Sequence, residues 1–179
     1  MTTALLIIDV QRAISAGQYA AFEIDRVIGA INGLGDRARA VGIPVVVIQH
    51  EEPTGDFQYG CDNWQLADDL AVAPQDIRLR KTTPDAFHNT ELQGVLQQCG
   101  VERLIVCGLQ TDYCVDTTVR RALALGYAVV LPADAHSTQD NAVLPAAQII
   151  AHHNAVLGSI SSFGVRVQVV PAQAVWMEA

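Results

Sequence analysis

Four runs of consecutive apolar residues recur along the chain, and each predicts a strand that is buried on both faces. The runs occupy residues 4–9, 43–49, 103–108 and 127–133. An unbroken apolar run is typical of a parallel sheet with helices on both sides. Segments 76–81 and 165–170 instead alternate between apolar and polar residues, as strands at the edges of such a sheet do.

Between the strands, apolar residues recur every three or four positions, which predicts amphipathic helices. These helical patterns cover residues 25–42, 89–100, 115–127 and 141–157. Gly42, Gly100 and Gly126 stand where the first three helices are expected to end, and Pro145 fits the fourth only in its first turn. The repeated alternation of strand and helix predicts a doubly wound α/β fold with right-handed crossovers.

The composition favours a single globular domain over residues 1–179. Half of the residues are apolar and 17% are charged, so we expect a substantial core and no extended disorder. The net charge of −8, with no cluster of Lys and Arg, argues against a nucleic-acid partner. No apolar run is long enough to span a bilayer and no leader pattern is present, so we expect no membrane partner.

The cysteines are too few for a disulfide scaffold in a chain of this length. They are Cys61, Cys99, Cys107 and Cys114. We therefore expect a reduced, cytoplasmic protein, and a small molecule rather than a macromolecule as its substrate.

Three reactive side chains follow the predicted strands, and ligands of open α/β sheets bind beyond the carboxyl ends of strands. Asp9 and Lys81 end strands, and Cys114 follows the turn after a third strand. With Thr111 or Asp112 as its N-cap, the next helix would present Cys114 in its first turn, where the positive helix end lowers a thiol pKa. Asp9 can then accept the thiol proton while Lys81 holds the carboxylate.

Each of these residues also has a structural interpretation. A cysteine at a helix start can be packing, a carboxylate after a strand can form a turn, and a lysine after an edge strand can be solvated. If the strand that carries Lys81 lies two places from the first strand, only a long side chain can reach Asp9.

The motifs "LLIIDVQ", "RKTTPDAF", "CGLQTDYCVDTTVRRALALGY" and "DAHST" resemble the isochorismatase-like cysteine hydrolase superfamily, which includes nicotinamidases. The resemblance covers residues 4–140 in the order and spacing of that family. It implies a Rossmann-like three-layer sandwich with a mostly parallel, six-stranded central sheet, and a homo-oligomer, dimeric or larger. It also implies an Asp9–Lys81–Cys114 triad, a cis peptide between Leu109 and Gln110, and an oxyanion hole formed by the backbone N–H groups of Gln110 and Cys114.

Two departures from the family's patterns narrow the expected chemistry. Nicotinamidases carry a metal-binding D-x-H motif and further histidines after the second strand, whereas this chain reads "IQHEEPTGDFQYG" and keeps only His50. We therefore expect no metal and no cofactor. Isochorismatases that cleave an enol ether commonly lack the cysteine, so Cys114 favours acyl transfer.

These observations predict a metal-independent cysteine hydrolase that cleaves a C–N bond of a small amide or lactam through a thioester. The alternatives are isochorismatase-type hydrolysis of an enol ether and a binding protein of the same fold without turnover. A nucleotide-binding protein is less compatible, because "IIDVQRAISAG" lacks the G-x-G-x-x-G motif after the first strand.

The expected substrate contacts are aromatic and polar side chains near the strand ends. They are Gln11, Trp64, Phe87, Tyr113 and His136. The irregular segment 50–65 adds Phe57 and Tyr59, which suggest an aromatic pocket wall, and four acids. These acids predict a preference for neutral or cationic amides over anionic substrates. They are Glu51, Glu52, Asp56 and Asp62.

Overall fold

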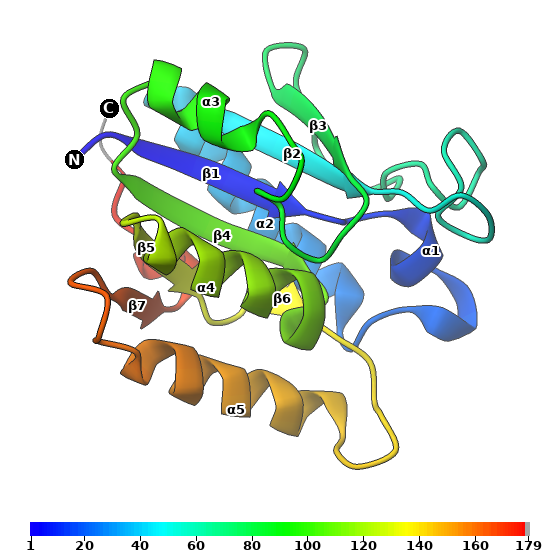
Figure 1. Ribbon diagram of the computed structural model, residues 1–179. Helices are drawn as coiled ribbons and strands as arrows, with labels where there is room; N and C mark the ends of the chain where they lie inside the picture. The colour runs from blue at the N-terminus through cyan, green and yellow to red at the C-terminus, as the bar shows by residue number, and fades with distance from the viewer. Residues whose placement is uncertain (178–179) are drawn as a thin grey trace.

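The computed structural model describes residues 1–177, in which a parallel sheet lies between two helical layers (Figure 1). The strands are β1 (Thr3–Ile8), β2 (Val45–His50), β3 (Ile77–Lys81), β4 (Arg103–Leu109), β5 (Ala128–Pro132), β6 (His136–Ser137) and β7 (Val167–Val170). Their order is β3-β2-β1-β4-β5-β7, every pairing is parallel, and β6 pairs with the end of β4.

The helices divide between the two faces of the sheet. They are α1 (Arg12–Ser15), α2 (Ile24–Ala40), α3 (Leu92–Gln98), α4 (Asp116–Ala124) and α5 (Ala146–Ser159). Short helical turns are η1 (Gly17–Tyr19), η2 (Thr111–Val115) and η3 (Ala172–Ala174). Figure 1 shows α2 behind the sheet and α3, α4 and α5 in front of it, so the expected three-layer α/β architecture is confirmed.

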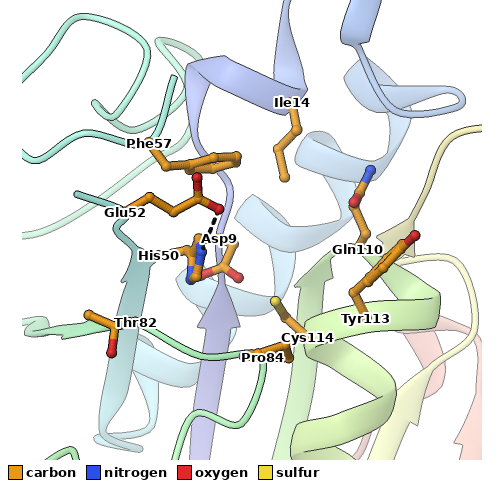
Figure 2. Close-up of a pocket in the computed structure, with 10 residues that line it drawn as sticks. All are labelled: Asp9, Ile14, His50, Glu52, Phe57, Thr82, Pro84, Gln110, Tyr113 and Cys114. Carbon is orange, nitrogen blue, oxygen red and sulfur yellow. Dashed lines mark hydrogen bonds and ion pairs between the residues drawn. The ribbon is translucent and has the colours of Figure 1, made fainter. Parts of the chain in front are cut away.

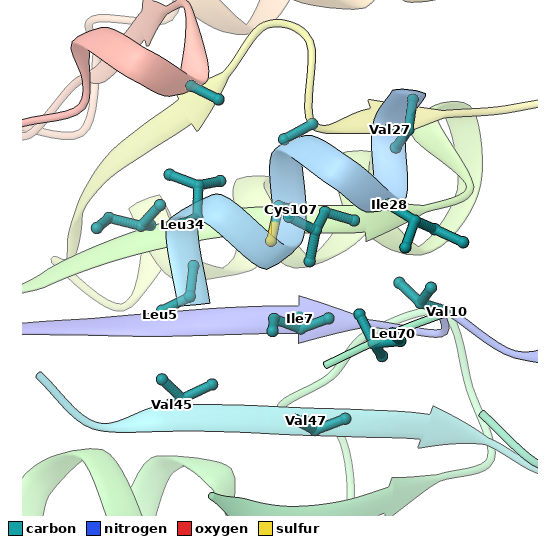
Figure 3. Close-up of a cluster of buried hydrophobic side chains, with 14 of the residues drawn as sticks. Leu5, Ile7, Val10, Val27, Ile28, Leu34, Val45, Val47, Leu70 and Cys107 are labelled. Carbon is teal, nitrogen blue, oxygen red and sulfur yellow. The ribbon is translucent and has the colours of Figure 1, made fainter. Parts of the chain in front are cut away.

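Strand β1 is covered on both sides because its side chains alternate between two apolar clusters. Leu5 and Ile7 pack against α2 (Figure 3), whereas Leu6 and Ile8 face the layer of α3 and α4. All four side chains are buried. The unbroken apolar run of the sequence therefore matches a central strand, as predicted.

The edges of the sheet are also where the alternating patterns place them. β3 and β7 lie at the two ends of the strand order, and the side chains of β3 alternate between more and less exposed positions. Within residues 1–177 the sheet has seven strands rather than six, because the two-residue β6 pairs with the end of β4. A segment of two residues carries no periodicity that a sequence pattern can reveal.

Gly108 allows an unusually close approach of β4 to β1. It pairs with Ile8, and its φ of +119° lies in a region that side chains rarely adopt. A Cβ atom at this position would lie 2.1 Å from the Ile8 carbonyl oxygen and 2.7 Å from the Ile8 nitrogen. The residues that follow the two strands are therefore held next to each other.

No helix in residues 1–177 has both the length and the apolar character needed to cross a membrane.

Candidate active site

Asp9, Lys81 and Cys114 come together at the carboxyl ends of three strands. Asp9 directly follows β1 with a φ of 51°, and its N–H donates to the carbonyl of Ile48 at 2.9 Å. Lys81 is the last residue of β3, and Cys114 lies in the η2 turn that follows β4.

The Lys81 side chain makes the longest reach of the three. β3 is separated from β1 by β2, so the lysine must extend past a neighbouring strand to approach Asp9. Its Nζ atom donates to Asp9 Oδ2 at 2.6 Å and to Cys114 Sγ at 3.2 Å. Both members of the ion pair are shielded from water, since the Lys81 side chain is 0% exposed and the Asp9 side chain is 2% exposed.

The second oxygen of the Asp9 carboxylate remains available. Oδ1 is buried and has no hydrogen-bond partner among the described residues, whereas Oδ2 is bound by Lys81. A buried carboxylate oxygen without a partner is unusual, and at a reactive centre it can serve as a proton acceptor.

The structure does not support a resting thiolate at Cys114. Burial and, after it, the neighbouring Asp9 charge together raise the pKa of the Cys114 thiol to about 12, and Lys81 only partly opposes these effects. The expected depression of this pKa by a helix end is therefore wrong, because desolvation and a like charge outweigh it. Burial alone would lower the pKa of Lys81, but the neighbouring Asp9 and Cys114 hold that pKa above its ordinary value.

The η2 turn is a π-helical turn rather than the first turn of an ordinary α-helix. The carbonyl of Gln110 accepts the N–H groups of both Tyr113 and Val115, each at 3.1 Å. The peptide between Leu109 and Gln110 is cis, as the family resemblance implied. Gln110 immediately precedes this turn as its N-cap residue, and Cys114 lies within it.

Thr111 and Asp112 do not act as helix caps, contrary to the expectation from sequence. Thr111 Oγ1 lies 2.8 Å from His136 Nδ1, and Asp112 accepts a hydrogen bond from Thr138 Oγ1 at 2.5 Å. Both side chains thus tie the turn to the segment around β6. The cap prediction failed because it considered only the local sequence.

His136 contacts the η2 turn through Thr111 and does not line the cavity. Its Nε2 lies 2.9 Å from Asn154 Oδ1, and Asn154 donates to the carbonyl of Ala133 at 3.1 Å. Burial lowers the pKa of His136 to about 4, so the ring is neutral at pH 7. With Nε2–H donating to Asn154, Nδ1 accepts the hydroxyl proton of Thr111.

The reactive groups open into a cavity of about 350 Å³, a volume suited to a small molecule. It is lined by Asp9, Ile14, His50, Glu52, Phe57, Thr82, Pro84, Gln110, Tyr113 and Cys114. Figure 2 shows His50, Glu52 and Phe57 on one side of the cavity, with Gln110 and Tyr113 on the other.

The structure places only Tyr113, of the five expected substrate contacts, in the lining of this cavity. Gln11 is fully buried, where its amide donates to the carbonyls of His50 and Trp64 and accepts the His50 N–H. Gln11 therefore holds the loop after β2 against β1.

Two of the expected aromatic contacts are engaged elsewhere. Phe87 is buried in the core, with its ring stacked on Tyr127 at 6.0 Å. Trp64 packs edge-on against Tyr59 at 4.8 Å. Neither ring reaches the cavity lining.

Thr82 and Pro84 were not recognised from the sequence as lining residues, and Glu52 was predicted only to disfavour anionic substrates. Thr82 and Pro84 follow β3, and Glu52 lies two positions after the end of β2. The rule that ligands bind beyond strand ends could have identified them. His50 was considered only as a metal ligand, yet its ring lines the cavity.

Comparisons with known proteins identify the family of this chain. The family model described as the isochorismatase domain matches residues 3–162. A streptothricin hydrolase from Streptomyces noursei is 38% identical over 96% of this chain, and the chain spans only 63% of that protein's length. A ureidoacrylate amidohydrolase from Caulobacter vibrioides is 31% identical over 70% of this chain and 72% of its own length.

A solved structure extends the agreement to three dimensions. The crystal structure of an isochorismatase from Pseudomonas putida KT2440 superposes with a TM-score of 0.90 at 33% identity, and covers 98% of this chain and 90% of the other. The relatives include proteins that are named as amidohydrolases. The chain therefore belongs to the isochorismatase family and is a hydrolase of that family.

Proposed function

We propose that this protein is a cysteine hydrolase that cleaves the C–N bond of a small amide or lactam without a metal ion. The observation that carries the proposal is the contact of Lys81 Nζ with both Asp9 and the Cys114 thiol at the base of the cavity. The amidohydrolase among the relatives supports an amide substrate.

The first half of the reaction transfers the acyl group to the protein. Asp9 Oδ1 accepts the thiol proton as Cys114 Sγ attacks the substrate carbonyl carbon, and the oxygen of the tetrahedral intermediate accepts hydrogen bonds from the N–H groups of Gln110 and Cys114. Asp9 returns the proton to the substrate nitrogen, the C–N bond breaks, and the amine leaves. Lys81 stays protonated and offsets the negative charge that develops.

The second half releases the product. Water attacks the thioester carbon as Asp9 takes one of its protons, and the C–S bond breaks. Asp9 returns this proton to the Cys114 sulfur, and the product leaves as a carboxylic acid that loses its own proton to the solvent. The high resting pKa of Cys114 fits this scheme, because the proton has to leave sulfur only when the carbonyl is in place.

An acyl-enzyme is expected when the purified protein is mixed with a panel of primary amides and lactams and then quenched in acid. Intact-mass and peptide analysis should find the acyl group on Cys114, and hydrolysis in ¹⁸O-labelled water should place one label in the carboxylate product. Turnover of isochorismate without a covalent adduct would support enol-ether hydrolysis instead.

Chelators are expected to leave the rate of amide hydrolysis unchanged. Among residues 1–177, no group of three or more His, Cys, Asp and Glu side chains is arranged to hold a metal ion, and the D-x-H motif is missing after β2. The test is elemental analysis together with rates before and after treatment with EDTA. One tightly bound zinc or iron ion per chain, with activity lost on its removal, would contradict the proposal.

A further inference from the structure

We infer that Glu52 and Phe57 form a subsite for a cationic group of the substrate, an ammonium or a guanidinium, on the wall facing the thiol. The inference rests on the proposed amide hydrolysis and adds which substrates are preferred. Both side chains line the cavity opposite Gln110 and Tyr113 (Figure 2).

The loop after β2 folds back so that the backbones of Glu52 and Phe57 are paired and both residues line the same cavity. The Glu52 N–H donates to the carbonyl of Phe57 at 3.0 Å, and the backbones of Glu52 and Gln58 form an isolated β-bridge. The ring of Phe57 contacts the His50 ring edge-on at 5.4 Å, which fixes its orientation. A carboxylate and an aromatic ring that line one cavity can offer a charge-assisted hydrogen bond and a cation–π contact, the two interactions that bind a substituted ammonium.

The charges around the cavity leave Glu52 largely uncompensated. Lys81 is paired with Asp9, and no Lys or Arg is among the lining residues. Glu51, the adjacent acid, pairs with Arg80 at 3.2 Å, and this guanidinium also lies over the Tyr59 ring. Among residues 1–177, the Glu52 carboxylate pairs only with the His50 ring, at 3.4 Å, and its side chain is 53% exposed.

Glu52 also lies at the boundary between the main cavity and a second hollow on the surface, a neighbouring cavity. Together with Thr82 it lines both the main cavity and a neighbouring cavity of about 430 Å³, whose other lining residues include Tyr59 and Gln58. A substrate with its carbonyl at Cys114 can therefore extend past Thr82 and place its cationic end at Glu52. A carboxylate at the same position would meet a like charge.

Three amides of nearly equal length test the subsite: δ-aminovaleramide is cationic, hexanamide is neutral and adipamate is anionic. Ammonia release should give the largest kcat/KM for δ-aminovaleramide and the smallest for adipamate. Glu52→Gln should lower the ratio of kcat/KM for δ-aminovaleramide to kcat/KM for hexanamide about 10- to 100-fold, the range expected for a charge-assisted hydrogen bond.

Asp62→Asn is the matched control, because Asp62 is an exposed acid of the same loop that lines neither hollow. It changes the net charge equally and should alter the preference by less than about twofold, since solvent screens an exposed charge. An unchanged preference in Glu52→Gln, or the same loss in both variants, would overturn the inference.

A second readout separates this inference from the amide proposal. Cationic trimethylammonioethyl and anionic sulfonatoethyl methanethiosulfonates form disulfides with thiols, and peptide mass analysis reports their rates at Cys114, normalised to mercaptoethanol. The ratio of cationic to anionic rates should fall in Glu52→Gln but not in Asp62→Asn. If none of the amides is hydrolysed, the proposed function fails, and this ratio still decides the role of Glu52.

Discussion

Replacing Cys114 with alanine is expected to lower amide turnover by about 10,000-fold or more, because loss of the nucleophile removes the covalent pathway. The variant should fold normally, since the thiol has one hydrogen-bonding contact, with Lys81, and alanine suits a helical turn. The measurement is kcat/KM on a verified substrate, with the thermal midpoint as a check on folding.

Cys99→Ala is the matched control for this variant. Cys99 is an exposed thiol at the end of α3 and should be replaceable without loss of activity. Asp9→Asn should inactivate the protein to a similar extent, and the Asp9→Asn, Cys114→Ala double variant should be no worse than either single variant, because members of one catalytic unit fail together. Substantial activity in Cys114→Ala would refute the mechanism.

Gly108→Ala is expected to destabilise the fold by more than about 3 kcal/mol, because the new Cβ would collide with backbone rather than with a movable side chain. The closest atom, the Ile8 carbonyl oxygen, would be 2.1 Å away, and the φ of +119° adds strain. β1 and β4 must separate to relieve the contact, which also moves Asp9 away from the η2 turn. The thermal midpoint should fall by about 10 °C or more.

Gly94→Ala provides the comparison for this substitution. Gly94 lies inside α3, and a Cβ added there would have no neighbouring atom within 4 Å, so alanine should raise helix stability slightly. A Gly108→Ala protein that melts with the parent would show that the strands adjust at little cost.

The arrangement of the sheet could be predicted from the sequence because a strand that is buried on both faces has apolar residues at successive positions. β1 and β4 are unbroken apolar runs and lie in the centre, whereas β3 and β7 alternate and lie at the edges. The positions of Asp9 and Lys81 followed from the rule that side chains after parallel strands share one edge.

The cavity walls were harder to predict, because contacts distant in sequence decide which aromatic side chain faces the substrate. Phe87 and Pro84 both follow β3, but Pro84 lines the cavity whereas the Phe87 ring stacks on Tyr127 in the core. Gln11 follows Asp9 closely and yet is used to hold the loop after β2. The direction of the Cys114 pKa shift likewise depends on burial, which no local motif reports.

Lys81 is the only lysine in this chain, and its ammonium group is completely enclosed. The other permanently cationic side chains are all arginines, so the folded molecule presents no lysine amine to acylating reagents, reductive methylation or lysine-specific proteases. Modification at this one position requires a local opening that separates the Lys81 amine from Asp9 and Cys114. The rate of labelling at the Lys81 amine therefore measures how often the enclosed ion pair opens, with no engineered reporter group.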